Sequence, residues 1–326
     1  MAVLCPASPE INVLRLTLLY IVWLIYNYMT QTSPAPLPVE KSQSNQIFTS
    51  KETKPNFLSA DFRQEVTALT TRLFIQLRRR PTTLIAGVLQ PLMWLLLFGA
   101  LFSGLPEGLV GDGQTYVQFL AAGIIVFTAF SSALNSGLPM LFDREFGFLN
   151  RILVAPLVSR FSIIAASAIF IMALSLIQTI AIVTVSGLMG AGLPSLSGLI
   201  VMALILTLLI VDFTMLSLGL AFAMPGHQEM LAFIFLVNLP LMFSSTALAP
   251  LAFMPTWLQW IASLNPLSWA IEPIRYVYSH STWTWNSVVF TAPWGSMTIL
   301  NAAIALFSFG VLVSILIRGT LRRGIA

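Results

Sequence analysis

FDREFGFLNRILVAPLVSR, residues 142–160, is a charged stretch inside a long apolar sequence. It carries five ionisable residues and one proline, and an apolar segment long enough to cross a bilayer lies on each side of it. Charged side chains are costly inside a membrane, so this stretch is expected to lie in water or against another protein. We interpret it as the place where a partner protein binds.

The whole chain has the composition of an integral membrane protein. Of its 326 residues, 57% are hydrophobic and 9% are charged, whereas about a quarter of the residues in a soluble domain are charged. At about 20 residues per crossing, one membrane domain with several helices fits better than two soluble domains. The net charge of +4 suits anionic lipid headgroups, and the sequence has no nucleic-acid-binding pattern.

The first 58 residues differ from the rest of the chain. Within residues 1–30 an apolar run is just long enough to cross a membrane. A cleaved signal peptide is not favoured, because Glu10 precedes the run and Tyr26-Asn27-Tyr28 follows it. Two alternatives remain: a peripheral membrane helix, or a segment that is not translated because synthesis starts at Met29. Residues 31–58 are polar and proline-rich, which predicts a disordered linker.

An amphipathic helix is predicted at residues 61–80, where the membrane domain of residues 59–326 begins. Its apolar residues recur every three or four positions as one stripe, namely Phe62, Val66, Leu69, Leu73 and Leu77. Its basic residues are Arg63, Arg72, Arg78, Arg79 and Arg80. We expect an interfacial helix, because each arginine adds about 1 kcal/mol of attraction to anionic headgroups. The alternative is a helix whose stripe packs on protein.

Six transmembrane helices are predicted after this helix, which makes the fold class an all-α membrane protein. They lie near residues 82–103, 115–138, 161–187, 197–223, 230–252 and 297–317. Nine arginines lie in the segments on one side of the membrane, against Arg275 alone on the other. Both ends of the six-span unit, and residues 142–160, are therefore expected to be cytoplasmic. The membrane would be a plasma (inner) membrane or an organellar membrane of bacterial origin.

The segment between spans five and six is broken by prolines and rich in tryptophan. Residues 250–278 are apolar but too interrupted to cross, so we predict short re-entrant helices in the outer leaflet. Glu272 and Arg275 stand three positions apart and can pair on one helix face. The favoured interpretation is a solvated or interfacial ion pair, and the alternative is a role at the outer exit.

Patterns for catalysis and metal binding are missing from the sequence. It has no G-x-x-x-x-G-K-[ST] phosphate loop, no G-x-S-x-G elbow and no H-E-x-x-H pair. Two histidines far apart and one cysteine suggest no metal cluster. The chain is therefore not expected to be an enzyme or to bind ATP. Asp212 alone lies well inside a predicted span, either as a functional carboxylate or as a protonated or hydrogen-bonded one.

Two stretches resemble the permease subunits of ABC-2 type exporters, such as drug-resistance, nodulation-factor and polysaccharide export permeases. The first combines DREFG at 143–147 with LVAPLVSR at 153–160, and the second is LNPLSWAIEPIR at 264–275. The resemblance covers about residues 60–323. Phe148 and Trp269 depart from the residues that the family often has at these positions.

The resemblance implies a homodimer, or a heterodimer with a similar permease, bound to two ATP-binding cassette ATPase subunits. ATP and magnesium would be held by those subunits, and this chain would carry no cofactor. A short coupling helix would dock into each ATPase, and its residues here would be Asp143, Arg144, Glu145, Gly147 and Arg151. The cargo would be an amphiphile: a lipid, a lipid-linked glycan or a hydrophobic drug.

Further residues are assigned to the remaining parts of such a transporter. For the substrate path or dimer seam they are Pro91, Trp94, Phe98, Asp212, Phe243 and Thr246. For the outer exit they are Trp269, Glu272 and Arg275. Two other functions stay open: a secondary transporter or channel that works without an ATPase, and a membrane scaffold. Transport on an ion gradient without an ATPase would indicate the first, and a partner ATPase activity that the chain does not alter would indicate the second.

Overall fold

The computed structural model divides the chain into two units, Met1–Glu52 and Thr53–Ala326. It describes residues 60–102, 115–147, 161–280 and 282–323, all in the second unit. The predictions for residues 1–30 and 31–58, and the one for Arg151, lie outside the described residues.

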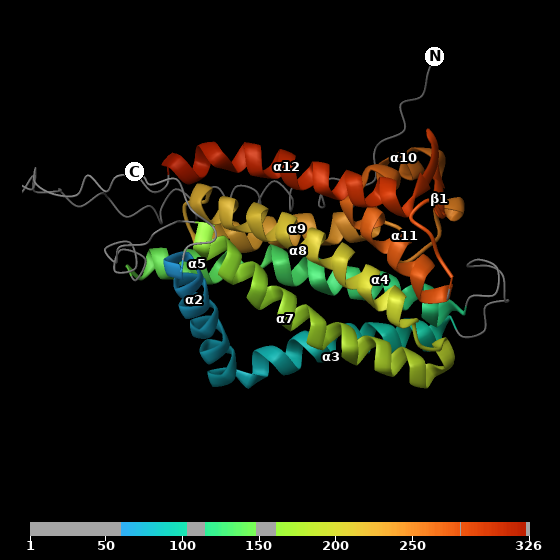
Figure 1. Cartoon of the computed structure of the whole chain (residues 1–326), viewed down its shortest axis with the longest axis horizontal. Coiled ribbons are helices and arrows are strands. Elements are labelled where there is room, and N and C mark those ends of the chain that lie inside the picture. Colours follow the sequence, from blue (N-terminus) through green and yellow to red (C-terminus); the bar gives the residue numbers. More distant parts are fainter. Residues whose placement is uncertain (1–59, 103–114, 148–160, 281, 324–326) are drawn as a thin grey trace, which may run out of the picture. The chain divides into compact units, whose positions relative to one another are not determined.

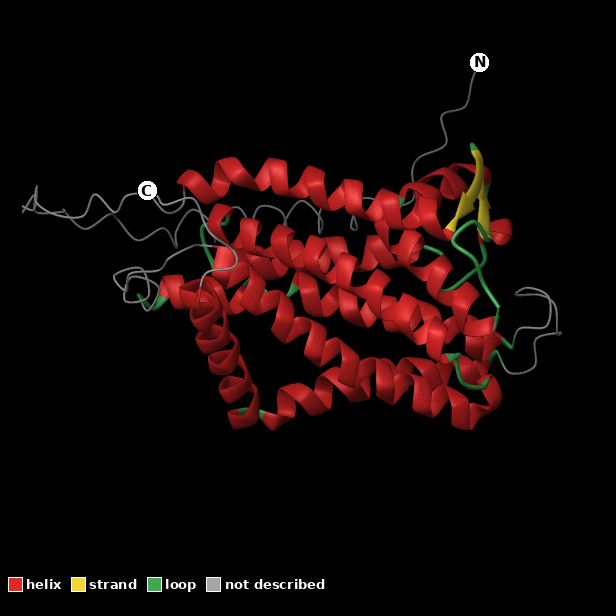
Figure 2. Cartoon of the chain, in the orientation of Figure 1, coloured by secondary structure: helices red, strands yellow, loops and turns green. Residues whose placement is uncertain are grey.

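The described part is a bundle of helices with one small β-hairpin (Figures 1 and 2). The helices are α2 (Ala60–Arg79), α3 (Pro81–Leu101), α4 (Tyr116–Leu134), α5 (Leu138–Glu145), α7 (Phe161–Ser186), α8 (Leu196–Ala223), α9 (His227–Phe243), α10 (Thr256–Leu264), α11 (Pro266–Ser279) and α12 (Ile299–Arg323). The hairpin is formed by β1 (Val288–Ala292) and β2 (Gly295–Thr298). Figure 1 shows α2 and α5 at one end of the bundle, here called the α2 end. The hairpin and α10 lie at the opposite end, here called the hairpin end.

Four segments are long and apolar enough to cross a membrane. They are Tyr116–Glu145, Ala165–Ala191, Leu196–Ala223 and Ile299–Ile317. Two shorter apolar helical segments, Ile85–Leu101 and His227–Phe243, lie where the first and fifth spans were predicted. The predicted end of the fifth span was wrong: α9 stops at Phe243 rather than near residue 252.

Helix α4 forms the centre of the bundle. It packs against α3, α7, α8 and α11, and its buried residues run almost continuously from Phe119 to Leu134. A capping box stabilises the N-terminus of α4. In it, Thr115 Oγ1 accepts a hydrogen bond from the Gln118 amide, and the Gln118 side chain accepts one from the Thr115 amide. Gly123 lets the backbone after α9 approach closely, since a Cβ there would lie 2.9 Å from Ala247 Cα.

The second long span ends in an irregular turn at the hairpin end. Helix α7 continues into a π-helical turn, Gly187–Ala191. Gly190 and Gly192 have φ angles of +89° and +74°, in the left-handed region that favours glycine. This turn reverses the chain, and Ser195 then caps α8 by accepting from the Gly198 amide at 3.1 Å.

The apolar stripe of α2 packs on protein, which is the alternative given above. Val66 is buried and the other stripe residues are partly buried, and α2 contacts α7. The ring of Phe74 lies 5.2 Å from that of Phe170 on α7. Phe74 and Ile75 remain 38% and 47% exposed, so α2 also keeps an apolar surface of its own.

The hairpin end contains the short helices α10 and α11 where interrupted helices were predicted. The β-hairpin that follows was not predicted. Its strands pair antiparallel, with Ala292 opposite Gly295 across a tight turn. Strand β2 runs directly into α12, so the hairpin joins α11 to the last span.

Candidate functional site: a helix-linking segment and a polar cavity

Three consecutive charged residues at the end of α5 each bind a different helix. We call Asp143, Arg144 and Glu145 the DRE segment. The Asp143 carboxylate accepts a hydrogen bond from Arg72 of α2, with 2.6 Å between Oδ2 and Nη2. Side chains of this pair are 21% and 31% exposed, respectively, so water screens the ion pair only in part.

Arg144 binds the C-terminal end of α8. Its Nη1 donates to the carbonyl of Ala221 at 2.9 Å, and its Nη2 donates to the carbonyls of Met224 and Pro225. The last carbonyls of a helix have no partner within the helix and carry partial negative charge. Arg144 therefore caps α8 and fixes the turn that leads into α9.

Glu145 binds the N-terminal end of α9. Its Oε1 accepts from the His227 amide at 2.6 Å, and its Oε2 lies 2.5 Å from His227 Nδ1. A carboxylate at a helix N-terminus satisfies a free amide and is favoured by the helix dipole. The ring of Phe142 lies 5.1 Å from the His227 ring and supports the contact. Any displacement of the DRE segment therefore acts on α9 directly.

Two residues next to the DRE segment face outward. Phe146 is 79% exposed, and Gly147 has a φ of +72° with open space around its Cα. Sequence analysis placed Asp143, Arg144, Glu145 and Gly147 on a helix that docks into a partner. In the structure the first three already bind this chain, and their docking role stays a prediction.

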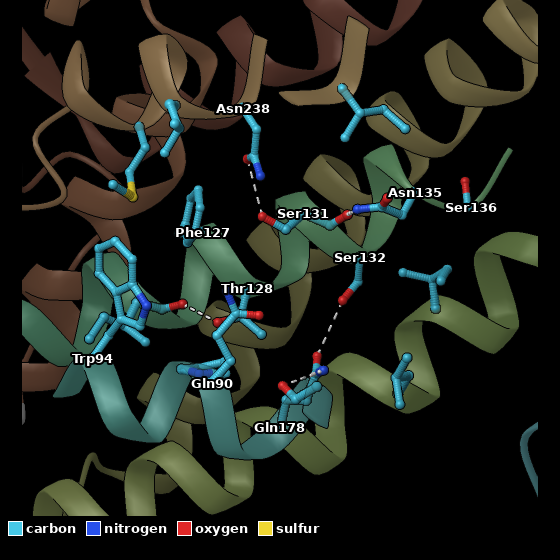
Figure 3. A pocket seen from close by; sticks show the side chains of 18 of the residues that line it. Gln90, Trp94, Phe127, Thr128, Ser131, Ser132, Asn135, Ser136, Gln178 and Asn238 are labelled. Carbon is cyan, nitrogen blue, oxygen red and sulfur yellow. Dashed lines mark hydrogen bonds between the residues drawn. The ribbon is translucent and has the colours of Figure 1, made fainter. Parts of the chain in front are cut away.

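A cavity of about 540 Å³ lies between α3, α4, α7 and α9. Figure 3 shows the polar side chains that gather around it from these four helices. The polar residues that line the cavity are Gln90, Thr128, Ser131, Ser132, Asn135, Ser136, Ser167, Gln178 and Asn238. Apolar side chains such as Trp94, Phe127 and Phe235 complete the wall. Polar groups within membrane-spanning helices are costly unless they have partners, which makes this cavity a candidate binding site.

Hydrogen bonds join the helices around this polar cavity (Figure 3). Ser131 of α4 donates to Asn238 Oδ1 of α9 at 3.2 Å. Ser132 donates to Gln178 Oε1 of α7 at 3.4 Å, and Gln178 Nε2 donates to the Gly87 carbonyl of α3 at 3.0 Å. A shift of α9 would therefore change both the cavity shape and its polar contacts.

The Glu272–Arg275 pair is buried, so the interpretation as a solvated or interfacial pair was wrong. Arg275 Nη1 lies 2.5 Å from Glu272 Oε1, and the side chains are 7% and 10% exposed. Arg275 also donates to the Thr246 carbonyl at 2.6 Å, and its guanidinium lies 3.6 Å from the centre of the Phe119 ring. The pair joins α11 to α4 and to the segment that follows α9.

Asp212 lies on α8 against α12, away from the residues that line the polar cavity. It is 4% exposed, and within the described residues its Oδ2 has no hydrogen-bond partner. The opposite position on α12 is Gly310, where a Cβ would overlap Oδ1 and lie 2.9 Å from Cγ. A glycine is required for this close contact between the two helices.

The other predicted residues lie in the cavity wall, in the core or on the surface. Pro91 and Trp94 line the polar cavity. Phe98 stacks between Trp94 and Phe102 on α3, and Phe243 is 59% exposed at the end of α9. Thr246 is buried, and Trp269 Nε1 donates to the Ser263 carbonyl at 2.7 Å. Three arginines, Arg78, Arg79 and Arg80, are exposed at the end of α2.

Comparison with known proteins shows to which family the chain belongs. Residues 64–279 match the family model described as ABC-2 type transporter. The chain belongs to this family. The ABC-2 chain is therefore an integral membrane protein and a transport permease subunit.

Curated relatives carry a matching description, "Putative transport permease ycf38". The protein of Porphyra purpurea is 56% identical over 255 residues, covering 78% of the ABC-2 chain and 87% of the relative. The protein of Pyropia yezoensis is 50% identical, covering 87% and 94%. The protein of Cyanophora paradoxa is 51% identical, covering 83% and 94%. The resemblance stated from the two sequence stretches is thus confirmed.

Proposed function

We propose that this chain is the membrane-spanning subunit of an ATP-driven exporter that moves an amphiphile out of the cytoplasm or the inner leaflet. One observation carries the proposal: α9 is held at its start by Glu145 and lines the polar cavity with Asn238. A force applied at the α2 end therefore has a short, physically continuous route to the cavity. Such a route is what a permease driven by a separate motor needs.

Residues 1–326 contain no phosphate-binding loop, so we place the motor in another protein. We assign it to two ATP-binding cassette ATPase subunits that hold ATP and magnesium. They would contact the α2 end, where Phe146 and Gly147 face outward. A second permease, identical or similar, would complete the transporter.

The proposed topology has six spans, with the α2 end in the cytoplasm. The exposed Arg78, Arg79 and Arg80 support this orientation, because arginines are enriched on the cytoplasmic side. The helices α3 and α9 would serve as spans one and five. The helices α10 and α11 would re-enter the outer leaflet with their backbone covered by protein.

Purification with a partner tests the proposed function. The tagged full-length chain is isolated in mild detergent, and the cassette ATPase recovered with it is reconstituted together with it in vesicles. We expect ATP-dependent export of a lipid-like substrate and a higher ATPase rate when the permease is present. Transport on an ion gradient without the ATPase would contradict the proposal, as would an ATPase rate that the chain does not alter.

Glu145 and His227 are expected to couple ATP hydrolysis to transport. Glu145→Ala removes both bonds to α9 but leaves Asp143 and Arg144 in place, so insertion should persist while substrate moved per ATP falls several-fold. His227→Ala removes only the side-chain bond, since the His227 amide remains, and a smaller fall is expected.

These two variants also distinguish two roles of Glu145: passing a movement to α9, and binding the ATPase directly. If Glu145 served only to bind the ATPase, His227→Ala would leave coupling unchanged. Loss of ATPase binding in Glu145→Ala would then accompany the loss of transport. Thr67→Ala on the exposed face of α2 provides a control that removes a side-chain hydrogen bond to the Arg63 carbonyl far from α9.

A further inference from the structure

We propose that the polar cavity binds the uncharged, hydroxyl-rich headgroup of a lipid, which makes a neutral glycolipid the substrate class. This inference rests on the proposed function, because it names the cargo of the same permease. It is carried by the chemistry of the residues that line the cavity.

The polar lining consists of amides and hydroxyls. None of the residues that the structure places around the cavity is acidic or basic. An anionic phosphate held away from water requires arginine, lysine or a helix N-terminus to compensate its charge. A smaller space continues past Ser136 and Pro139 to Arg72, but that guanidinium is paired with Asp143. The site therefore favours an uncharged headgroup.

The cavity offers both hydrogen-bond donors and acceptors. Thr128 donates its hydrogen to the Ile124 carbonyl at 2.7 Å, so its oxygen lone pairs remain to accept. Asn238 accepts from Ser131 through Oδ1, and among the described residues its Nδ2 has no partner. Sugar hydroxyls both donate and accept, so they can donate to acceptors such as Thr128, whereas phosphate oxygens only accept and cannot.

The size and the lining of the cavity suit a lipid headgroup whose acyl chains stay outside the cavity. A volume of about 540 Å³ accommodates a small sugar, but not a whole lipid with two acyl chains. Phe235 and Leu239 of α9 line the cavity and are also 69% and 49% exposed. Acyl chains can follow these side chains into the surrounding apolar phase.

Native mass spectrometry of the full chain in nanodiscs tests this inference. The nanodiscs contain phosphatidylcholine with equal small amounts of monohexosyl diacylglycerol and phosphatidylglycerol that carry the same acyl chains. We expect the ejected protein to retain the hexosyl lipid about tenfold over phosphatidylglycerol, because the cavity offers no cationic side chain to compensate the phosphate charge. Equal retention, or more phosphatidylglycerol, would overturn the inference.

Paired variants test whether the lipid binds in the polar cavity. Thr128→Val should lower the preference several-fold, while Thr207→Val should not. Thr207 on α8 makes the same bond to its own helix, to the Ala203 carbonyl at 2.7 Å, but does not line the cavity. Gln90→Leu is a second test, and because Gln90 is exposed this change is expected to leave folding intact. A preference unchanged in both Thr128→Val and Gln90→Leu would place the lipid elsewhere and reject the cavity as its site.

The test of the substrate class and the test of the proposed function can fail independently. A chain that stimulates its ATPase and exports lipid but retains phosphatidylglycerol would refute only the substrate class. A chain that retains the hexosyl lipid through Thr128 but never responds to an ATPase would refute only the exporter mechanism.

Discussion

Arg275→Met is expected to destabilise the folded chain by about 3–5 kcal/mol, because it leaves the buried Glu272 carboxylate without its partner. The same change removes the hydrogen bond to the Thr246 carbonyl and the contact with the Phe119 ring. These contacts hold α11 and the end of α9 against α4. The measurement is the fraction of detergent-purified protein that stays monodisperse after heating.

Changing both partners provides the control for this prediction. The double variant Arg275→Met with Glu272→Leu removes both buried charges, so it should be more stable than Arg275→Met alone. Glu272→Gln keeps the shape and a hydrogen-bond acceptor, so it should cost less stability than Arg275→Met. Arg275→Met with unchanged heat resistance would mean that the pair is exposed, as the sequence suggested.

The burial of this pair shows why sequence reasoning failed at the hairpin end. Spacing of three residues correctly predicts that Glu272 and Arg275 share a helix face. It does not reveal that α11 packs on α4, because that contact joins residues 156 positions apart. Pro240 and Pro250 were visible in the sequence, but neither marks the end of α9, because Pro240 lies inside the helix and the helix ends at Phe243. The bond from Arg275 to the Thr246 carbonyl, just after α9, could not be predicted because it joins residues 29 positions apart.

The long spans were predictable because each is one continuous apolar segment. Their caps follow local rules, as at Thr115 and Ser195. The β-hairpin escaped prediction because its two strands have only five and four residues, and neither strand alternates clearly between buried and exposed positions. The sequence of α2 shows an apolar stripe but not what that stripe contacts. The contact with α7 arises only in the folded chain.

Sequence analysis identified only part of the candidate site. The DRE segment and Trp94 were identified from sequence, but the partners His227 and Asn238 were not. One local signal for the cavity was available: Thr128, Ser131, Ser132, Asn135 and Ser136 recur at three- and four-residue spacing in an apolar span. The residues on α7 and α9 that complete it could not be inferred, because only tertiary packing brings Gln178 and Asn238 to α4.

Gly310→Ala is expected to destabilise the contact between α8 and α12, typically by about 1–3 kcal/mol for an overpacked core position. The added methyl would occupy the place of Asp212 Oδ1, and both helix backbones are too closely packed to move freely. The readout is again the heat resistance of the purified protein. Gly226→Ala, in the turn before α9, is not a suitable control because its Cβ would lie 2.7 Å from Glu229 Oε2 and 3.1 Å from Glu145 Oε1.

Asp212→Ala should restore stability to Gly310→Ala, because it removes the atoms with which the methyl collides. A double-mutant cycle measures this coupling, and additive losses would show that the two residues do not touch. Asp212→Asn keeps the shape without an ionisable group, so it separates packing from chemistry. Normal stability with normal transport would make Asp212 a packing residue, whereas normal stability with lost transport would give its carboxyl group a role in the transport cycle.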